Sequence, residues 1–397
     1  MTSPEQRAAR LTSIRNTKMA RSAHAYVRGN TVNFYNWLES SGSRVPAGPS
    51  VWICGDCHLG NLGPVADSKG RVAVQIRDLD QTVIGNPAHD MIRLGLSLAC
   101  AARGSNLPGI TTARILEQLV ASYESALSGD FDGKKDKTYR PNGIQKLLAQ
   151  SVRRRWRDLA LERLQADRAM LPKGKTFWAL KPEERAGIVE LFDQESIRTV
   201  ITRLQGRDAS ESVALVDAAY WIKGCSSLGR LRYAVMLRVG QGKGSSLCLV
   251  DVKEGVKAAA PRAAGVTMPE DNAARVVEGA KALSPHLGDR MSAAQLLGAS
   301  VVLRELKPQD LKIEVGRLTH KEATALAGYL AGVVGRAHGR QMDLATRNSW
   351  RAELARARTT NLDAPSWLWS SVVELVSTHE AAYLDHCRRV TLPKSAQ

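Results

Sequence analysis

The sequence predicts a mixed α+β fold, in which a β-rich segment is flanked on both sides by helices. Residues 213–256 carry short apolar runs separated by glycine-rich turns, a pattern typical of antiparallel strands. Two earlier runs, Val51–Cys54 and Arg71–Ile76, also have the pattern of short strands. Residues 109–210 and 318–339 instead space their apolar residues as helices do. These three observations exclude an all-helical or all-β chain.

Length and composition set the broad class. The chain has 397 residues, of which 44% are apolar, so it can bury two or three structural units. A formal net charge of +17 favours an anionic partner such as a nucleotide, a nucleic acid or an acidic surface, although a basic surface alone would give the same charge. The six cysteines are too scattered for a disulfide framework. We expect a protein of a reducing compartment.

The sequence carries no pattern of a secretory or membrane-spanning segment. The first 21 residues are polar and rich in arginine, without the apolar stretch of a signal peptide. The longest run of small apolar residues, Leu94–Ala102, is well short of the roughly 20 residues that cross a bilayer. We therefore expect a cytoplasmic protein.

Acidic and amide side chains gather after the two early strands. The stretch Gly55-Asp56-Cys57-His58-Leu59-Gly60-Asn61 follows the first, and Arg77-Asp78-Leu79-Asp80 follows the second. Carboxylate and amide oxygens are ligands that Mg²⁺ prefers, and a spare carboxylate can position or deprotonate a hydroxyl. If the two strands form one hairpin, these groups converge. Asp90 precedes the apolar helix Met91–Ala102 and is either its N-cap or a brace for the preceding loop.

The β-rich segment carries features that suit phosphate. A glycine-containing turn, Gly224–Gly229, precedes the predicted strand Leu231–Val239, and Lys253 ends the strand that begins at Leu247. Backbone N–H groups of such a turn can approach phosphate, and a lysine can neutralise its charge. The turn is not a Walker A motif, because Arg230-Leu231 stands where Lys and Ser or Thr are required.

Three later or neighbouring helices complete the prediction. The helix Asp271–Leu283 offers Glu278 as a partner for Lys253. The helix Leu318–Gly339 places His338 at its C-terminus, where the helix dipole favours a cation. The basic run Arg153–Arg157, with Trp156 inside it, either grips phosphates and stacks on a base or is a solvated helix face with the indole in the core.

Together these motifs resemble a known superfamily. The Gly55–Asn61 stretch, Asp78, Asp80 and the later Asp90 resemble the catalytic loop, metal-binding acids and supporting aspartate of aminoglycoside phosphotransferases, in the protein-kinase-like superfamily. A closer resemblance is to a bacterial family called domain of unknown function 2252. Its motifs match, in order and over most of the chain, Tyr26–Asn30, Cys54–Asn61, the Gly224–Gly229 turn, Val252–Glu254 and Ala331–Arg340.

The resemblance implies a two-lobed protein-kinase-like fold that is circularly permuted, because the glycine turn follows Asp78 instead of preceding it. It implies a catalytic-loop and metal-binding part in residues 1–108, a basic helical insertion in 109–210, a nucleotide-binding lobe in 211–315, and helices that complete the larger lobe in 316–397. It further implies an ATP- and Mg²⁺-dependent phosphotransferase for an unknown hydroxyl acceptor, either a small molecule or a protein.

The resemblance also assigns roles to individual residues. The implied catalytic residues are Asp56 and His58; the implied metal-binding residues are Asn61, Asp78 and Asp80; the implied nucleotide-binding residues are Gly224, Ser226, Ser227, Gly229, Lys253 and Glu278. Ser226 departs from the pattern, since a middle glycine is typical there.

Four alternatives stay open. Asp56-Cys57-His58 also resembles the opening motif of binuclear metallophosphoesterases, whose later Gly-Asn-His-Glu stretch is absent here. Cys54 and Cys57 have the spacing of redox or zinc sites, but no second pair completes a tetrahedral set. The charge and Arg153–Arg157 would suit a nucleic-acid binder. A pseudoenzyme that binds nucleotide without transferring phosphate would carry many of the same motifs.

Overall fold

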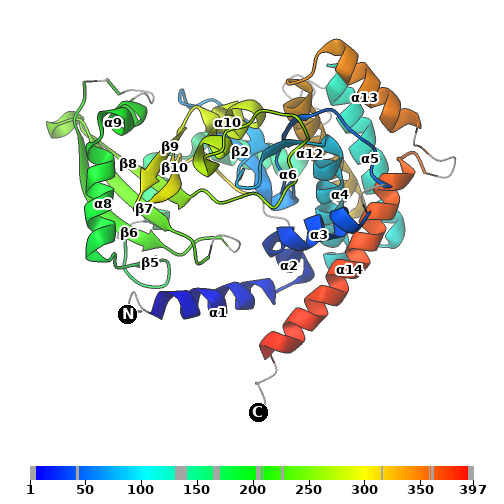
Figure 1. Ribbon diagram of the computed structural model, residues 1–397, viewed down its shortest axis with the longest axis horizontal. Helices are drawn as coiled ribbons and strands as arrows, with labels where there is room; N and C mark the ends of the chain where they lie inside the picture. The colour runs from blue at the N-terminus through cyan, green and yellow to red at the C-terminus, as the bar shows by residue number, and fades with distance from the viewer. Residues whose placement is uncertain are drawn as a thin grey trace.

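The computed structural model describes residues 6–41, 44–129, 141–163, 170–202, 207–208, 210–224, 228–313, 316–356, 358 and 362–391. These residues form a sheet-bearing half and a helical half, and the first helix runs beneath the sheet-bearing half to the edge of the helical half (Figure 1). The mixed α+β class predicted from the sequence is confirmed.

One half is built on a six-stranded antiparallel sheet with the strand order β5-β6-β7-β8-β10-β9. Its strands are β5 (Phe177–Trp178), β6 (Val213–Trp221), β7 (Arg232–Val239), β8 (Ser246–Glu254), β9 (Met291–Leu296) and β10 (Ala299–Glu305). The predicted strands over 231–239, 247–252 and 300–306 thus form with shifts of a few residues, whereas β9 was missed. Its pattern is weak because four of its six residues are small or polar.

Each face of the sheet is covered by apolar packing. Along β7, Tyr233, Val235 and Leu237 face a core shared with α8 (Pro182–Asp193) and α9 (Glu195–Thr202). The alternate residues Ala234 and Met236 join a second core. This period of two, with both faces buried, explains why the segment is apolar throughout.

The other half is a helical assembly around α4 and α5. It contains α2 (Ala23–Gly29), α3 (Thr31–Ser41), α4 (Pro87–Gly104), α5 (Gly109–Ser128), α12 (His320–Gly339), α13 (Leu344–Arg356) and α14 (Ser366–Thr391). Helices α5 and α12 approach closely because Gly335 has no side chain: a Cβ there would lie 2.8 Å from the carbonyl oxygen of Tyr123. In the described part of the chain, no helix is both long enough and apolar enough to span a bilayer.

Two small strand pairs lie between the halves. Strand β1 (Val51–Ile53) pairs with β4 (Val83–Gly85), and β2 (Leu62–Ala66) pairs with β3 (Val72–Ile76), both antiparallel. The expectation that the strands at 51–54 and 71–76 share one hairpin is therefore wrong. Each pairs with a strand too short and too rich in glycine or proline to be recognised from periodicity.

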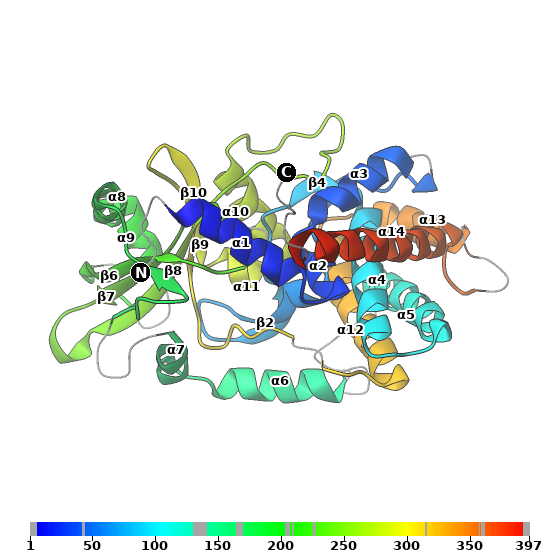
Figure 2. The same cartoon turned by 90° about the horizontal axis from the view of Figure 1, so that it is seen from below.

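The segment 109–210, predicted as one helical insertion, divides between the halves. Helix α5 packs on α12 in the helical half, while β5, α8 and α9 belong to the sheet half. Only α6 (Asn142–Arg153) and α7 (Trp156–Arg163) run along one edge between them (Figure 2). Trp156 is partly buried against the sheet core, and Arg153, Arg155 and Arg157 are exposed.

Helix α1 (Arg7–Met19) ties the halves together. Arg7 forms a buried ion pair with Glu184 of α8 at 2.7 Å, and Leu11 is buried in the sheet core. At its other end, the Tyr383 hydroxyl of α14 donates to the Ala20 carbonyl at 3.1 Å. Helices α10 (Asn272–Leu283) and α11 (Pro285–Gly288) pack between the sheet and the small strand pairs.

Candidate active site

The loop that carries Asp56 is braced from below by Asp90. The Asp90 carboxylate accepts hydrogen bonds from the backbone N–H groups of Cys54 at 2.7 Å and Gly55 at 2.9 Å. Gly55 has a φ of +73°, so a side chain there would be strained. Asn86, not Asp90, caps α4. Of the two roles predicted for Asp90, the structure therefore supports that of a brace for the loop and not that of an N-cap.

The brace is itself held by buried groups. His338 Nε2 lies 3.1 Å from the Asp90 carboxylate, and the Tyr123 hydroxyl lies 2.9 Å from His338 Nδ1. His338 has no exposed surface. His338 lies in the last turn of α12 as predicted, but this end of the helix is buried against α4 and α5 rather than solvated.

Asp56 projects beside an arginine that sequence reasoning missed. Its carboxylate lies 2.9 Å from Arg93 Nη2, and Arg93 also donates to the Val27 carbonyl. His58 Nε2 lies 3.8 Å from the same carboxylate. Burial raises the pKa of Asp56 above its ordinary value even though Arg93 lowers it. An arginine within an otherwise apolar helix was the signal, since a buried charge needs a partner.

Asn61 joins the two acidic segments. Its Nδ2 donates to the backbone carbonyls of Asp56 at 3.0 Å and Asp78 at 3.2 Å. Both segments are thereby fixed relative to each other by the amide nitrogen of Asn61, and its carboxamide oxygen is by its chemistry an acceptor.

Asp78 and Asp80 meet Lys253 across the gap between the sheet and the loops. Lys253 Nζ lies 3.3 Å from Asp78 Oδ1 and is in closer contact with Asp80 Oδ2. The charges of Lys253 and Arg232 hold the pKa of Asp78 well below its usual range. Burial and the neighbouring Asp78 raise the pKa of Asp80 to about 6. The predicted convergence of the acids and Lys253 is present.

Further charged groups line the sheet beside Lys253. Arg232 makes two contacts with the Asp251 carboxylate, at 2.9 and 2.6 Å, and Lys223 Nζ lies 3.5 Å from it. The Lys223 ammonium also sits 3.9 Å from the ring centre of Trp221. Burial lowers the pKa of Lys223 well below its ordinary value, against the effect of Asp251.

These groups surround one cavity of about 440 Å³, within the range of small-molecule sites. Its polar lining residues include Lys18, Arg21, Asp56, His58, Asn61, Arg77, Asp78, Asp80, Lys223, Arg232, Asp251, Lys253, Arg304 and Lys312. Leu79, Val276, Leu287, Met291 and Val302 provide an apolar part of the wall. Cations exceed acids in this lining.

The predicted glycine turn is only partly described. Gly224 lines the cavity, with a φ of +81°, and its carbonyl accepts a hydrogen bond from Lys18 Nζ at 2.9 Å. Gly229 has a φ of +96° and is absent from the cavity lining among the described residues. Ser226 and Ser227 lie outside the described residues.

Glu278 is not the partner of Lys253. It is exposed on α10, and its carboxylate pairs with Lys281 at 2.7 Å. The inward face of α10 instead presents Arg275, which donates to the backbone carbonyls of Asp80 and Thr82. The helix was placed correctly, but its rotation was not, because a charged residue on an amphipathic helix is more often solvated.

The two cysteines of the Asp56 loop are buried. Cys54 Sγ lies 3.7 Å from the Asp78 carbonyl oxygen. A hydrogen bond to Cys54, together with burial, raises the pKa of Cys57 well above its ordinary value. A thiol held protonated is a poor metal ligand or redox nucleophile.

The donor set suits Mg²⁺ as a partial site. Magnesium is commonly held by one or two carboxylates together with substrate phosphates. The Asp78 side chain is 47% exposed, and Asn61 and Asp80 lie beside it in the cavity lining. Among the described residues, no three His, Cys, Asp or Glu side chains form a complete metal cluster. Phosphate oxygens would have to complete the coordination.

Comparison with known proteins supports the family resemblance. A family model described as "Uncharacterized protein conserved in bacteria (DUF2252)" matches residues 7–389. The chain belongs to this family. No curated protein matches the sequence. No solved structure matches it either.

Proposed function

We propose that the protein is an ATP- and Mg²⁺-dependent phosphotransferase that acts on a hydroxyl acceptor. The observation that carries the proposal is the contact of Lys253 with Asp78 and Asp80. Lys253 comes from the sheet, the two acids come from the loop after β3, and 175 residues separate Lys253 from Asp78. A phosphate-neutralising lysine facing metal-binding acids is the arrangement that phosphoryl transfer requires.

Each residue has a role in this proposal. Lys253 binds donor phosphates, and Asp78 and Asn61 hold Mg²⁺ while Asp80 supports Asp78. These residues would hold Mg²⁺, which would supply positive charge to neutralise the charge that develops on the phosphates during transfer. Asp56 orients the acceptor hydroxyl and takes its proton as the oxygen bonds to the γ-phosphorus and the bond to ADP breaks. The raised pKa of Asp56 makes it a better proton acceptor.

Two further residues position Asp56. Arg93 fixes one carboxylate oxygen, and His58 lies near the other, on the Oδ2 side. The Asp90 brace fixes the backbone that precedes Asp56. Positioning of this kind can account for several kcal/mol of a transfer barrier.

We also propose that the fold is a circular permutation of the protein-kinase arrangement. The end of α12 supports this, because Gln341 contacts β1 directly. Its Oε1 accepts from the Trp52 N–H at 2.8 Å, and its Nε2 donates to the Trp52 carbonyl at 3.1 Å. The end of α12 therefore lies beside the strand that precedes the Asp56 loop, although that strand comes much earlier in the sequence.

The geometry favours transfer over phosphoester hydrolysis. A binuclear phosphoesterase would need the Asp56 carboxylate as a metal ligand. Here that carboxylate is paired with Arg93, whose side chain is 1% exposed. The buried Arg93 guanidinium would therefore compete with a metal ion for the Asp56 carboxylate. The exposed side chains of Arg153, Arg155 and Arg157 provide the remaining support for a nucleic-acid binder.

Calorimetric titration with ATP, with and without Mg²⁺, tests the proposal. We expect Asp78→Ala to remove the Mg²⁺-dependent part of the affinity and Lys253→Ala to weaken binding in both conditions. Lys281→Ala is the matched control, because Lys281 pairs with Glu278 outside the cavity. Mn²⁺-dependent phosphoester hydrolysis that ignores Lys253 would favour the esterase. Steeply salt-dependent nucleic-acid binding that is lost on changing Arg153–Arg157 would instead favour a nucleic-acid-binding protein.

A further inference from the structure

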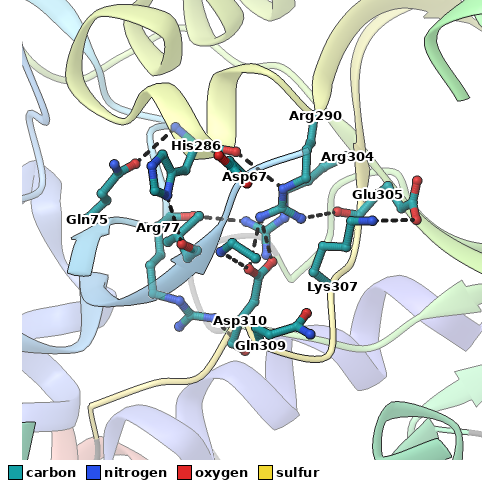
Figure 3. A network of polar contacts seen from close by, with 12 residues as sticks. Asp67, Gln75, Arg77, His286, Arg290, Arg304, Glu305, Lys307, Gln309 and Asp310 are labelled. Carbon is teal, nitrogen blue, oxygen red and sulfur yellow. Dashed lines mark hydrogen bonds and ion pairs between the residues drawn. The ribbon is translucent and has the colours of Figure 1, made fainter. Parts of the chain in front are cut away.

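A cluster of three arginines lies where the chain leaves β10 (Figure 3). Arg290 has no exposed side-chain surface and binds both carboxylate oxygens of Asp310 at 2.9 Å. Arg77 reaches only the Asp310 backbone carbonyl, at 3.5 Å, and Arg304 donates to the Arg77 carbonyl at 2.9 Å. The Asp310 carboxylate is therefore used mainly by Arg290.

Arg77 and Arg304 are the two members that line the cavity. The Nε atom of each is buried without a hydrogen-bond partner in the described structure. A buried, unmatched donor on a charged group is costly. The two arginines are joined by the hydrogen bond from Arg304 to the Arg77 carbonyl, and an anion in this part of the cavity would stabilise both charges.

The other acids that face this part of the cavity already have cationic partners. Asp251 is bound by Arg232 and Lys223. Asp78 and Asp80 are bound by Lys253. Asp56, at the far side, is bound by Arg93. None of these carboxylates contacts Arg77 or Arg304 by a hydrogen bond or ion pair among the described residues.

We propose that Arg77 and Arg304 bind a second anionic group, a phosphate or carboxylate, and that this group belongs to the acceptor. The inference rests on the proposed function. The triphosphate of the donor is accounted for by Lys253 and the metal-binding acids, and its base and ribose are neutral. The arginine pair is thus left for the other substrate, so the acceptor is a small molecule that carries both a hydroxyl and an anionic group.

Inorganic phosphate is the probe for this site, titrated by calorimetry at low salt without nucleotide or metal. We expect Arg304→Gln and Arg77→Gln each to weaken phosphate binding about tenfold, as for loss of a charge-assisted hydrogen bond. Arg304→Lys keeps the charge and should lose less. Arg238→Gln is the matched control, since Arg238 is exposed on β7 of the same sheet. Thermal unfolding without phosphate verifies that each variant is folded. If Arg304→Gln does not fold, Arg77→Gln and Arg304→Lys carry the test.

Three outcomes would overturn the proposal. Folded arginine variants could bind phosphate as the wild type does, or Arg238→Gln could weaken binding equally, which would indicate net charge alone. Phosphate could also be lost on Lys253→Ala and not on Arg304→Gln.

A second titration separates donor from acceptor. ATP with Mg²⁺ should bind phosphate-saturated protein with an affinity within about twofold of that for free protein, because two separate sites do not compete. Full competition would place the anion at the donor phosphates and overturn the assignment to the acceptor. Phosphate binding that depends on Arg304 in a protein that does not bind ATP would instead contradict the proposed function and leave the anion site standing.

Discussion

The two sides of the cavity are built in different ways. Apart from Asp251 on β8, the acidic side comes from one short stretch: Asp56, Asn61, Asp78, Asp80 and the bracing Asp90 all fall within residues 56–90. The cationic side comes from the whole chain, with residues 18, 77, 223, 232, 253, 304 and 312 contributed by separate elements. The acids are held by local backbone contacts, whereas the cations are brought in by the fold of the sheet and by α1.

This difference predicts which substitutions should reduce activity and which should reduce stability. Changes on the acidic side should affect chemistry, or the local brace that supports it. Changes far from the cavity should affect stability, because they loosen the contacts that bring the cations to the acids.

The largest effect is expected for the chemistry itself. Asp78→Ala should reduce Mg²⁺-dependent ATP turnover about 10³-fold, because it removes a preorganised charge from the metal site. The measurement is ADP release with and without Mg²⁺. Asp289→Ala, an exposed aspartate outside the cavity lining, is the control. Equal losses in the two variants would contradict the assignment.

Asp90→Ala should reduce both the folding stability and the ATP turnover, because Asp90 supports the loop that carries Asp56. It leaves the N–H groups of Cys54 and Gly55 and the ring of His338 without their acceptor. At about 1–3 kcal/mol for each buried unmatched donor, we expect a loss of about 4 kcal/mol in urea unfolding. Asp343→Ala removes only a surface helix cap and should cost about 1 kcal/mol. A loss no larger than this control would show that the brace is unimportant.

Arg7→Ala tests the contact that anchors α1 to the sheet half. It leaves Glu184 in a buried pocket where Arg7 and the Tyr233 hydroxyl are its side-chain partners. Breaking a buried pair by removing one member should cost about 3 kcal/mol. Lys281→Ala breaks a solvated pair and should cost under about 1 kcal/mol. Equal costs for the two would mean that α1 is not a structural tie.

The smallest effect expected for a single residue is the loss of folding stability at low pH. Burial lowers the pKa values of His89 and His379 to about 4, from an ordinary 6.5. The unfolded chain therefore binds protons between pH 6.5 and 4 that the folded chain does not, so stability is full above pH 6.5 and falls as the pH drops. At pH 5 each histidine should reduce the unfolding free energy by about 2 kcal/mol. His379→Gln should remove about half of that decline; an unchanged decline would contradict the assignment.

Much of the acidic side was predictable because its spacing is short. Asp56, Asn61, Asp78 and Asp80 lie close enough in sequence that turn chemistry and strand ends bring them together, even though the strand pairing was wrong. Lys253 could be placed at the end of its strand by the period-two pattern. Its contact with the acids required the resemblance to a known family, since no local rule joins residues 175 positions apart.

The missed residues share a physical reason. Arg93, Lys223, Arg232 and Arg304 are charged residues within apolar stretches of the sequence, and the groups that they contact are distant in sequence. The error over Glu278 is of the same kind: helix α10 was located by its spacing, but which of its charged residues faces inward depends on tertiary packing. The buried setting of His338 was not anticipated, because the burial of a helix end cannot be deduced from its sequence.

The central claim is that Lys253 and Asp78 act in one cleft, and a double-mutant cycle on Mg²⁺-dependent ATP affinity tests it most directly. The cycle uses Lys253→Met, Asp78→Asn and the double variant, with affinities from calorimetry. The account predicts that the two changes are not additive, with a coupling energy of about 1 kcal/mol or more, as for groups in contact. Additive losses, or an unchanged affinity in either single variant, would contradict it.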